Sequence, residues 1–125
     1  MKIFHLCCDP GIPVDGTKGA SVHLRSLADA FARHSELTLI TSRPPAPSGR
    51  PYPVVASGGP IAVEALVGRF GVPDVIYERY SLGCRVGLDA ARRLGRPFVL
   101  EVNAPLVDEA RRHRPEILGP QDAGV

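Results

Sequence analysis

The chain has 125 residues, a hydrophobic content of 44% and a formal net charge of +2 at pH 7. These values are typical of one globular domain or part of one, and they exclude a disordered chain. The mild charge, the absence of tryptophan and the lack of an apolar run of ~20 residues argue against a nucleic-acid-binding surface and a membrane span. Three cysteines, an odd number, indicate free thiols and a reducing compartment, so we expect a cytoplasmic protein, attached at most peripherally to the inner face of a membrane.

The first half of the chain alternates between strand and helix patterns. Residues 2–8 are nearly all apolar, as in a parallel strand covered on both faces. Apolar residues at helical spacing predict a helix over 20–34, and residues 37–41 form a second strand pattern. Residues 43–53 contain five prolines and one glycine, which predicts a surface connection without regular structure. Residues 54–56 then form a short edge strand.

The second half continues the alternation. A helix over 60–70 is followed by a strand over 74–80, and a last clear strand covers 97–102. Pro105 begins a further helix, and residues 119–125 are expected to be an unstructured tail. Between the strands at 74–80 and 97–102 we predict a helix that is capped by Ser81 and ends at Gly95. Four of its residues are expected to face the core: Cys84, Leu88, Ala91 and Leu94.

Strands that alternate with helices predict an α/β fold with a Rossmann-like doubly wound parallel sheet, here over residues 1–118. Ligands of such sheets bind outside the carboxyl ends of the strands. Polar residues stand at three of those ends: the loop from Asp9, the run 78–80 and the run 101–103. Since these ends meet at one edge, we expect the ligand site there.

The loop after the first strand is the strongest of these signals. Gly16 and Gly19 permit positive φ and close approach of a ligand, and Lys18 adds a charge beside the amino end of a helix. These features predict a phosphate site, although neither the Walker A nor the dinucleotide fingerprint is present. The alternative is a loop whose glycines only allow tight turns. The length of the loop favours function, because most strand-to-helix loops have about 2–6 residues.

The charged residues at the other strand ends have two interpretations. Glu78 and Arg79 either face a ligand, or serve in an ion pair such as Arg79 with Glu101, which we favour because buried charges usually find protein partners. Glu101 shares this ambiguity, and Asn103 is placed to cap the helix that follows it. His23 lies in the first turns of the ligand-side helix, where it could contact substrate or simply be solvated.

Histidine and cysteine in the first strand could suggest a metal. His5 and Cys7 share a face, but two ligands are too few for a closed zinc site, and Cys8 points to the opposite face. We therefore interpret the cysteines as core residues and expect no metal.

Several blocks of the sequence resemble one enzyme family. Residues 11–25, the run Ser-Leu-Ala-Asp-Ala-Phe after them and Leu-Thr-Leu-Ile-Thr at 37–41 are similar to the amino-terminal half of family 4 glycosyltransferases. Asp-Val-Ile-Tyr-Glu-Arg-Tyr at 74–80 and Phe-Val-Leu-Glu-Val-Asn-Ala-Pro-Leu at 98–106 resemble further blocks in the same order.

The resemblance implies the acceptor-side domain of a GT-B enzyme, which transfers a sugar from a nucleotide-sugar donor with retention and without a metal or other cofactor. In the family the first loop approaches the donor diphosphate, and many members carry a histidine at the position that Asn103 occupies here, which makes Asn103 the candidate catalytic residue. The donor- and acceptor-binding residues implied are Gly16, Thr17, Lys18, Gly19, Ala20, Ser21, His23, Glu78, Arg79, Tyr80 and Glu101.

The family's carboxyl-terminal nucleotide-binding domain has no counterpart in these residues. By itself the chain is therefore expected to be inactive, to need that domain in cis or in trans, and to self-associate through uncovered apolar surface. The expected partners are a nucleotide-sugar and an acceptor of unknown identity. Two alternatives stay open: a non-catalytic flavodoxin-like binding module, and a subunit that depends on a partner chain.

Overall fold

The computed structural model describes residues 1–42, 49–56 and 60–103. Five strands form one parallel sheet in the order β3-β2-β1-β4-β5. Their bounds are Lys2–Cys7 for β1, Glu36–Thr41 for β2, Val54–Ala56 for β3, Val75–Arg79 for β4 and Phe98–Glu101 for β5. The predicted α/β fold with a Rossmann-like parallel sheet is confirmed. The helix predicted from Pro105 and the tail at 119–125 lie outside the described residues.

The strand order distinguishes between two kinds of doubly wound sheet. The observed order is that of the first five Rossmann strands, 3-2-1-4-5, whereas a flavodoxin-like sheet has the order 2-1-3-4-5. The flavodoxin-like alternative therefore does not describe this topology. The chain leaves β1 toward β2 on one side and returns to β4 on the other, so the crevice at which strand order reverses lies between the carboxyl ends of β1 and β4.

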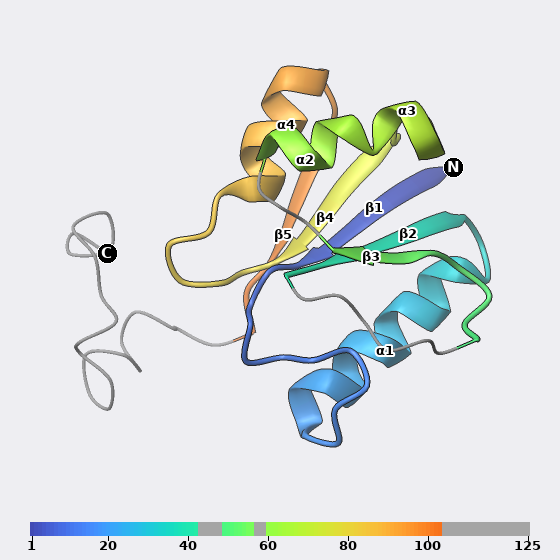
Figure 1. Ribbon diagram of the computed structural model, residues 1–125, viewed down its shortest axis with the longest axis vertical. Helices are drawn as coiled ribbons and strands as arrows, with labels where there is room; N and C mark the ends of the chain where they lie inside the picture. The colour runs from blue at the N-terminus through green and yellow to red at the C-terminus, as the bar shows by residue number, and fades with distance from the viewer. Residues whose placement is uncertain (43–48, 57–59, 104–125) are drawn as a thin grey trace.

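Helices cover both faces of the sheet (Figure 1). Helix α1, Gly19–Ala32, packs on one face, and α2, Pro60–Ala65, with α3, Val67–Phe70, and α4, Val86–Leu94, pack on the other. Two apolar clusters fill the layers, one around Ile3, Leu24 and Leu39 beneath α1, the other around Phe4, Leu6 and Ile76 beneath α2 and α4. Strand β1 contributes to both clusters because alternate side chains point to opposite faces, which explains its continuous apolar run.

Helix α4 differs from its prediction. It begins at Val86 rather than near Ser81, because Gly83 has a positive φ of 71° and residues 81–84 form a turn closed by a 3.2 Å bond from the Cys84 N–H to the Ser81 carbonyl. The Ser81 hydroxyl is buried without a hydrogen-bond partner among the described residues, so it is not a cap. The later start moves the buried stripe from Cys84, Leu88, Ala91 and Leu94 to Gly87, Ala90 and Ala91, with Leu94 partly buried.

The helix predicted over 60–70 is also interrupted. Helices α2 and α3 are separate because Leu66 lies in a turn, and Gly71, with φ of 86°, ends α3 as predicted. The remaining strands and α1 begin and end within two residues of their predicted bounds.

Candidate functional site

The loop between β1 and α1 is fixed in place by arginine side chains. One guanidinium nitrogen of Arg25, Nη1, donates to the carbonyls of Val14 at 2.8 Å and Gly16 at 2.5 Å. From the other side, Arg50 Nη2 lies 3.4 Å from an Asp15 carboxylate oxygen. Val14 itself is buried in the core beneath α1. Side-chain contacts therefore hold the loop in one conformation at the carboxyl edge of the sheet. Arg25 is a positioning residue that the sequence did not single out.

The two loop glycines have different roles from those predicted. Neither Gly16 nor Gly19 has a positive φ. A Cβ added to Gly16 would lie 2.6 Å from Ser21 Oγ and 2.9 Å from Pro13 Cγ, whereas one added to Gly19 would meet nothing within 4 Å. Glycine is thus required at position 16, because the loop approaches the buried Ser21 too closely for a side chain. At position 19 neither a steric contact nor a positive φ requires glycine.

The amino terminus of α1 opens toward this loop. Lys18 is the N-cap residue, its side chain caps no backbone amide, and the first turn holds no acidic residue. The first amides of a helix have no intrahelical acceptor, so those of Gly19 and Ala20 point outward with the positive end of the helix dipole. Thr17, Lys18 and Gly19 are exposed, Ala20 is half-buried and Ser21 is buried. The geometry suits an anion, and the occupant stays a prediction.

A second polar cluster lies on the same face of the sheet as α1. His23 Nε2 lies 2.8 Å from Glu101 Oε1, and Arg79 Nη1 lies 3.8 Å from that oxygen. The predicted pair of Arg79 with Glu101 is therefore present, although the closer partner is His23. Burial acts to raise the pKa of Glu101, but hydrogen bonds from His23 and Asn103 lower it below its ordinary value.

The other residues predicted near Glu101 are brought to it as well. The Asn103 side chain, expected to cap a helix outside the described residues, hydrogen-bonds the Glu101 carboxylate instead. The backbone N–H of Tyr80 donates to the Glu101 carbonyl at 2.8 Å, which joins the ends of β4 and β5. The His23 side chain is about half exposed, at 52%, whereas that of Glu101 is 14% exposed. The cluster thus offers a histidine at the surface that is oriented by a largely buried carboxylate.

Glu78 does not form a ligand-facing pair with Arg79. Adjacent strand residues point to opposite faces, so Arg79 faces α1 while Glu78 faces α4. Glu78 is 2% exposed, and its Oε2 accepts a 3.2 Å hydrogen bond from the Gly87 N–H in the first turn of α4. Glu78 therefore supplies from β4 the cap that Ser81 was expected to give. Burial is the main cause that raises its pKa, to about 8.

Two cysteines lie beside Glu78. Cys8 follows β1, Cys84 precedes α4, and both are partly buried. The Cys8 thiol donates to Cys84, which lowers the pKa of Cys84 and raises that of Cys8. Cys7, by contrast, is fully buried beneath α1, as predicted for a core cysteine. Nothing in the sequence brings Cys8 and Cys84 together, because their contact depends on the pairing of β1 with β4.

His5 lies at the centre of the α1 face without exposure to solvent. Its ring makes edge contacts with Phe31 and Tyr77 at centroid distances of 5.4 and 5.2 Å, and neither ring nitrogen has a hydrogen-bond partner among the described residues. Burial lowers the pKa of His5 to about 4, against an opposing attraction from Glu101. His5 is therefore a neutral core residue at pH 7 rather than a ligand.

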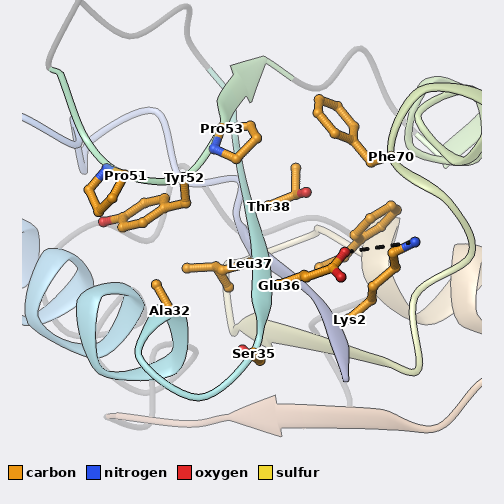
Figure 2. Close-up of a pocket in the computed structure, with 11 residues that line it drawn as sticks. Lys2, Ala32, Ser35, Glu36, Leu37, Thr38, Pro51, Tyr52, Pro53 and Phe70 are labelled. Atoms are coloured by element: carbon orange, nitrogen blue, oxygen red, sulfur yellow. Dashed lines mark ion pairs between the residues drawn. The ribbon is translucent and has the colours of Figure 1, made fainter.

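A pocket of about 340 Å³ lies at the opposite end of the sheet. Figure 2 shows it between the start of β2, the Pro51–Pro53 segment and Phe70, with the ion pair of Lys2 and Glu36 at its border, 3.8 Å apart. The amino ends of parallel strands are not where doubly wound sheets bind ligands, and the polar clusters described above lie at the other end. We do not assign this pocket to the functional site.

Comparison with models of known protein families gives no match, and comparison with curated proteins gives no relative. Among the described residues, no helix is both long enough and apolar enough to cross a bilayer.

Proposed function

We propose that the chain is the acceptor-side, amino-terminal part of a retaining glycosyltransferase that uses a nucleotide-sugar donor. The observation that supports this function best is the fixed loop before α1, which sets Lys18 and the open amides of α1 at the carboxyl edge of the sheet. The sequence blocks that resemble family 4 glycosyltransferases include this loop and the ends of β4 and β5.

In this proposal the first loop stabilises the departing diphosphate. Negative charge develops on the diphosphate as its bond to the sugar breaks, and fixed N–H dipoles with a nearby cation stabilise that charge without reorganising. Lys18 and the amides of Gly19 and Ala20 supply these groups. Arg25 acts indirectly, by holding the loop carbonyls in place.

The His23 cluster is proposed to serve the acceptor. With the Glu101 carboxylate accepting from His23 Nε2–H, the Nδ1 atom remains as an acceptor for a hydroxyl proton. Asn103 would act through Glu101, and Glu78 would act only by holding α4. The reaction would take place in the cytoplasm, with peripheral contact to a membrane at most, and the nucleotide would be held by a second domain in cis or in trans.

A partner surface is part of the proposal. Val99, Leu100 and Val102 at the end of the described chain are 45%, 45% and 61% exposed, and β5 has one neighbouring strand among the described residues. An apolar strand edge favours pairing with another chain. We expect self-association at this edge, and light scattering should give a mass above that of one chain. A monomer at high concentration would remove this part of the proposal.

The chain's two lysines allow a matched test of the donor site. With a carboxyl-terminal domain supplied, Lys18→Ala should weaken binding of a nucleoside diphosphate about 10- to 150-fold, because a charge-assisted hydrogen bond contributes roughly 1.5–3 kcal/mol. Lys2→Ala removes the same charge at the opposite end of the sheet and should leave affinity unchanged. Isothermal calorimetry on both variants and the parent measures the effect. Equal affinities for Lys18→Ala and the parent would remove Lys18 from the site.

A further inference from the structure

Three side chains with metal-binding atoms meet on the α4 face of the sheet. They are Cys8, Glu78 and Cys84, and their ligand atoms all lie within 4.8 Å of one another. Each comes from a different segment: the residue after β1, the strand β4 and the turn before α4. The cluster lies in the crevice between the ends of β1 and β4, on the opposite face of the sheet from His23 and Glu101.

The spacing of these atoms fits a tetrahedral ion. Zinc–sulfur bonds of about 2.3 Å and zinc–oxygen bonds of about 2.1 Å at tetrahedral angles place neighbouring ligand atoms roughly 3.6–3.8 Å apart. Cys84 Sγ lies 3.8 Å from Glu78 Oε2. Small side-chain rotations are therefore enough to bring the ligand atoms to bonding distance around one ion.

The surroundings already orient two of the three ligands. The Gly87 N–H holds the Glu78 carboxylate at 3.2 Å, and the Val86 N–H hydrogen-bonds the Cys84 sulfur. Outer hydrogen bonds of this kind fix ligand orientation in metal sites. A side chain at position 87 would disturb the arrangement, because a Cβ there would lie 3.0 Å from the Glu78 carboxyl carbon.

The cluster also lacks a cation. Glu78 is buried, and no lysine, arginine or histidine of the described residues forms an ion pair with it. Arg79, its neighbour in sequence, faces the other side of the sheet. A bound divalent cation would give the deprotonated Glu78 an opposite charge at bonding distance, whereas the described residues offer it only the Gly87 N–H and the Cys84 thiol.

We propose that Cys8, Glu78 and Cys84 form a zinc site with two thiolates, one carboxylate and an open fourth position. Two soft sulfur ligands favour Zn²⁺ over Mg²⁺, Ca²⁺ or Mn²⁺, and three protein ligands leave room for a water molecule. Binding would release the protons held by the three ligand groups and tie the end of β1 to the turn that begins α4. This site is independent of the proposed glycosyltransferase function.

Cobalt substitution tests the site on the complete, reduced chain. Co²⁺ should bind one equivalent per chain and give a thiolate-to-cobalt charge-transfer band together with the intense visible bands of a tetrahedral ion, and one equivalent of Zn²⁺ should abolish both. Cys8→Ser and Cys84→Ser should each lower the charge-transfer intensity by about half, since one thiolate remains, and should weaken zinc binding, measured against a chromophoric chelator, by about 10- to 100-fold. Cys7→Ala is the matched control, since Cys7 is buried on the other face and should leave both signals intact.

The zinc-dependent rise in melting temperature provides a second measurement. It should occur in the parent and in Cys7→Ala, and it should be absent in Glu78→Gln, which keeps the shape of the side chain without the anion. Circular dichroism shows which variants are folded. The proposal is overturned if Co²⁺ gives no charge-transfer band while thiol titration finds three free cysteines, or if Cys8→Ser binds zinc as the parent does. It is also overturned if the freshly purified chain carries a Cys8–Cys84 disulfide that reforms at once after reduction.

Discussion

Replacing the buried histidine of β1 should change how stability depends on pH. His5 has no solvent exposure, and burial lowers its pKa from 6.5 to about 4. Between these two values the unfolded chain binds a proton at His5 that the folded chain does not, so the contribution of His5 to the free energy of unfolding falls as the pH decreases from 6.5 to 4. A difference of about 2.5 pH units at about 1.4 kcal/mol each gives a loss of about 3 kcal/mol.

The charged groups around His5 shift its pKa in both directions, but the net shift remains downward. Glu101 favours the protonated ring, whereas His23 and Arg79 disfavour it, and burial is the largest cause. Glu101 has a lowered pKa of its own, so the stability that it contributes is lost at more acidic pH, below its ordinary value of 4.5. Glu78, whose pKa is raised to about 8 by burial, contributes with the opposite sign across the window from pH 4.5 to 6.5, because its folded form holds a proton that the unfolded form has lost. The contribution of His5 is therefore read as the difference between the parent and a variant without this histidine.

Urea denaturation at several pH values across this window measures the effect. His5→Leu replaces the ring with an apolar side chain of similar size. The difference in the free energy of unfolding between the parent and His5→Leu should change by about 3 kcal/mol across this window, while stability at pH 7 changes little because two unpaired ring nitrogens are removed. His34→Gln, which removes an exposed histidine after the end of α1, is the matched control. If the His5→Leu chain keeps the slope of the parent, the ring is not held neutral by burial.

Five further substitutions, two of them controls, test the packing around the site by their denaturation midpoints. Glu101→Ala should destabilise the chain by about 1–3 kcal/mol through its lost hydrogen bonds, and an unchanged midpoint with lost ligand affinity would reverse that assignment. Gly87→Ala should cost about 1–3 kcal/mol because its Cβ would be 3.0 Å from its neighbours, whereas Gly68→Ala, with open space around it, should be neutral or stabilising by up to about 1 kcal/mol. Gly16→Ala should lower the midpoint, whereas Gly19→Ala should leave it nearly unchanged. Equal effects of the two substitutions would show that the contact with Ser21 is not the reason for glycine at position 16.

The elements could be predicted because local pattern and tertiary environment agree. Strand β1 has an uninterrupted apolar sequence since both of its faces are covered, and prolines and glycines mark most of the connections. The start of α4 could not be predicted in the same way. Ser81 is a good capping residue locally, but the positive φ of Gly83 interrupts the helix and the cap comes from Glu78 on a neighbouring strand.

The sequence predicted the edge of the sheet at which the polar clusters lie and the pair of Arg79 with Glu101, but not the other contacts of these clusters. Period-two alternation already implies that Glu78 and Arg79 point to opposite faces, so their separation could have been derived from the sequence. The contact of Cys8 with Cys84 could not, because it requires the strand order that places β1 beside β4. The contact of His23 with Glu101 likewise requires the tertiary arrangement that brings the first turns of α1 within side-chain reach of the end of β5.

The location of donor binding is the most direct test of the proposed function. In a titration of the ¹⁵N-labelled chain with a nucleotide-sugar, followed by NMR, the amide shifts should be confined to the carboxyl edge of the sheet and largest for Gly16 to Ser21. Binding is expected to be weak, because in this proposal the chain supplies one face of the cleft. Shifts centred on the pocket near Lys2, Tyr52 and Phe70 would contradict the assignment of the site to the carboxyl edge. The absence of any shift at millimolar ligand would contradict the proposed donor.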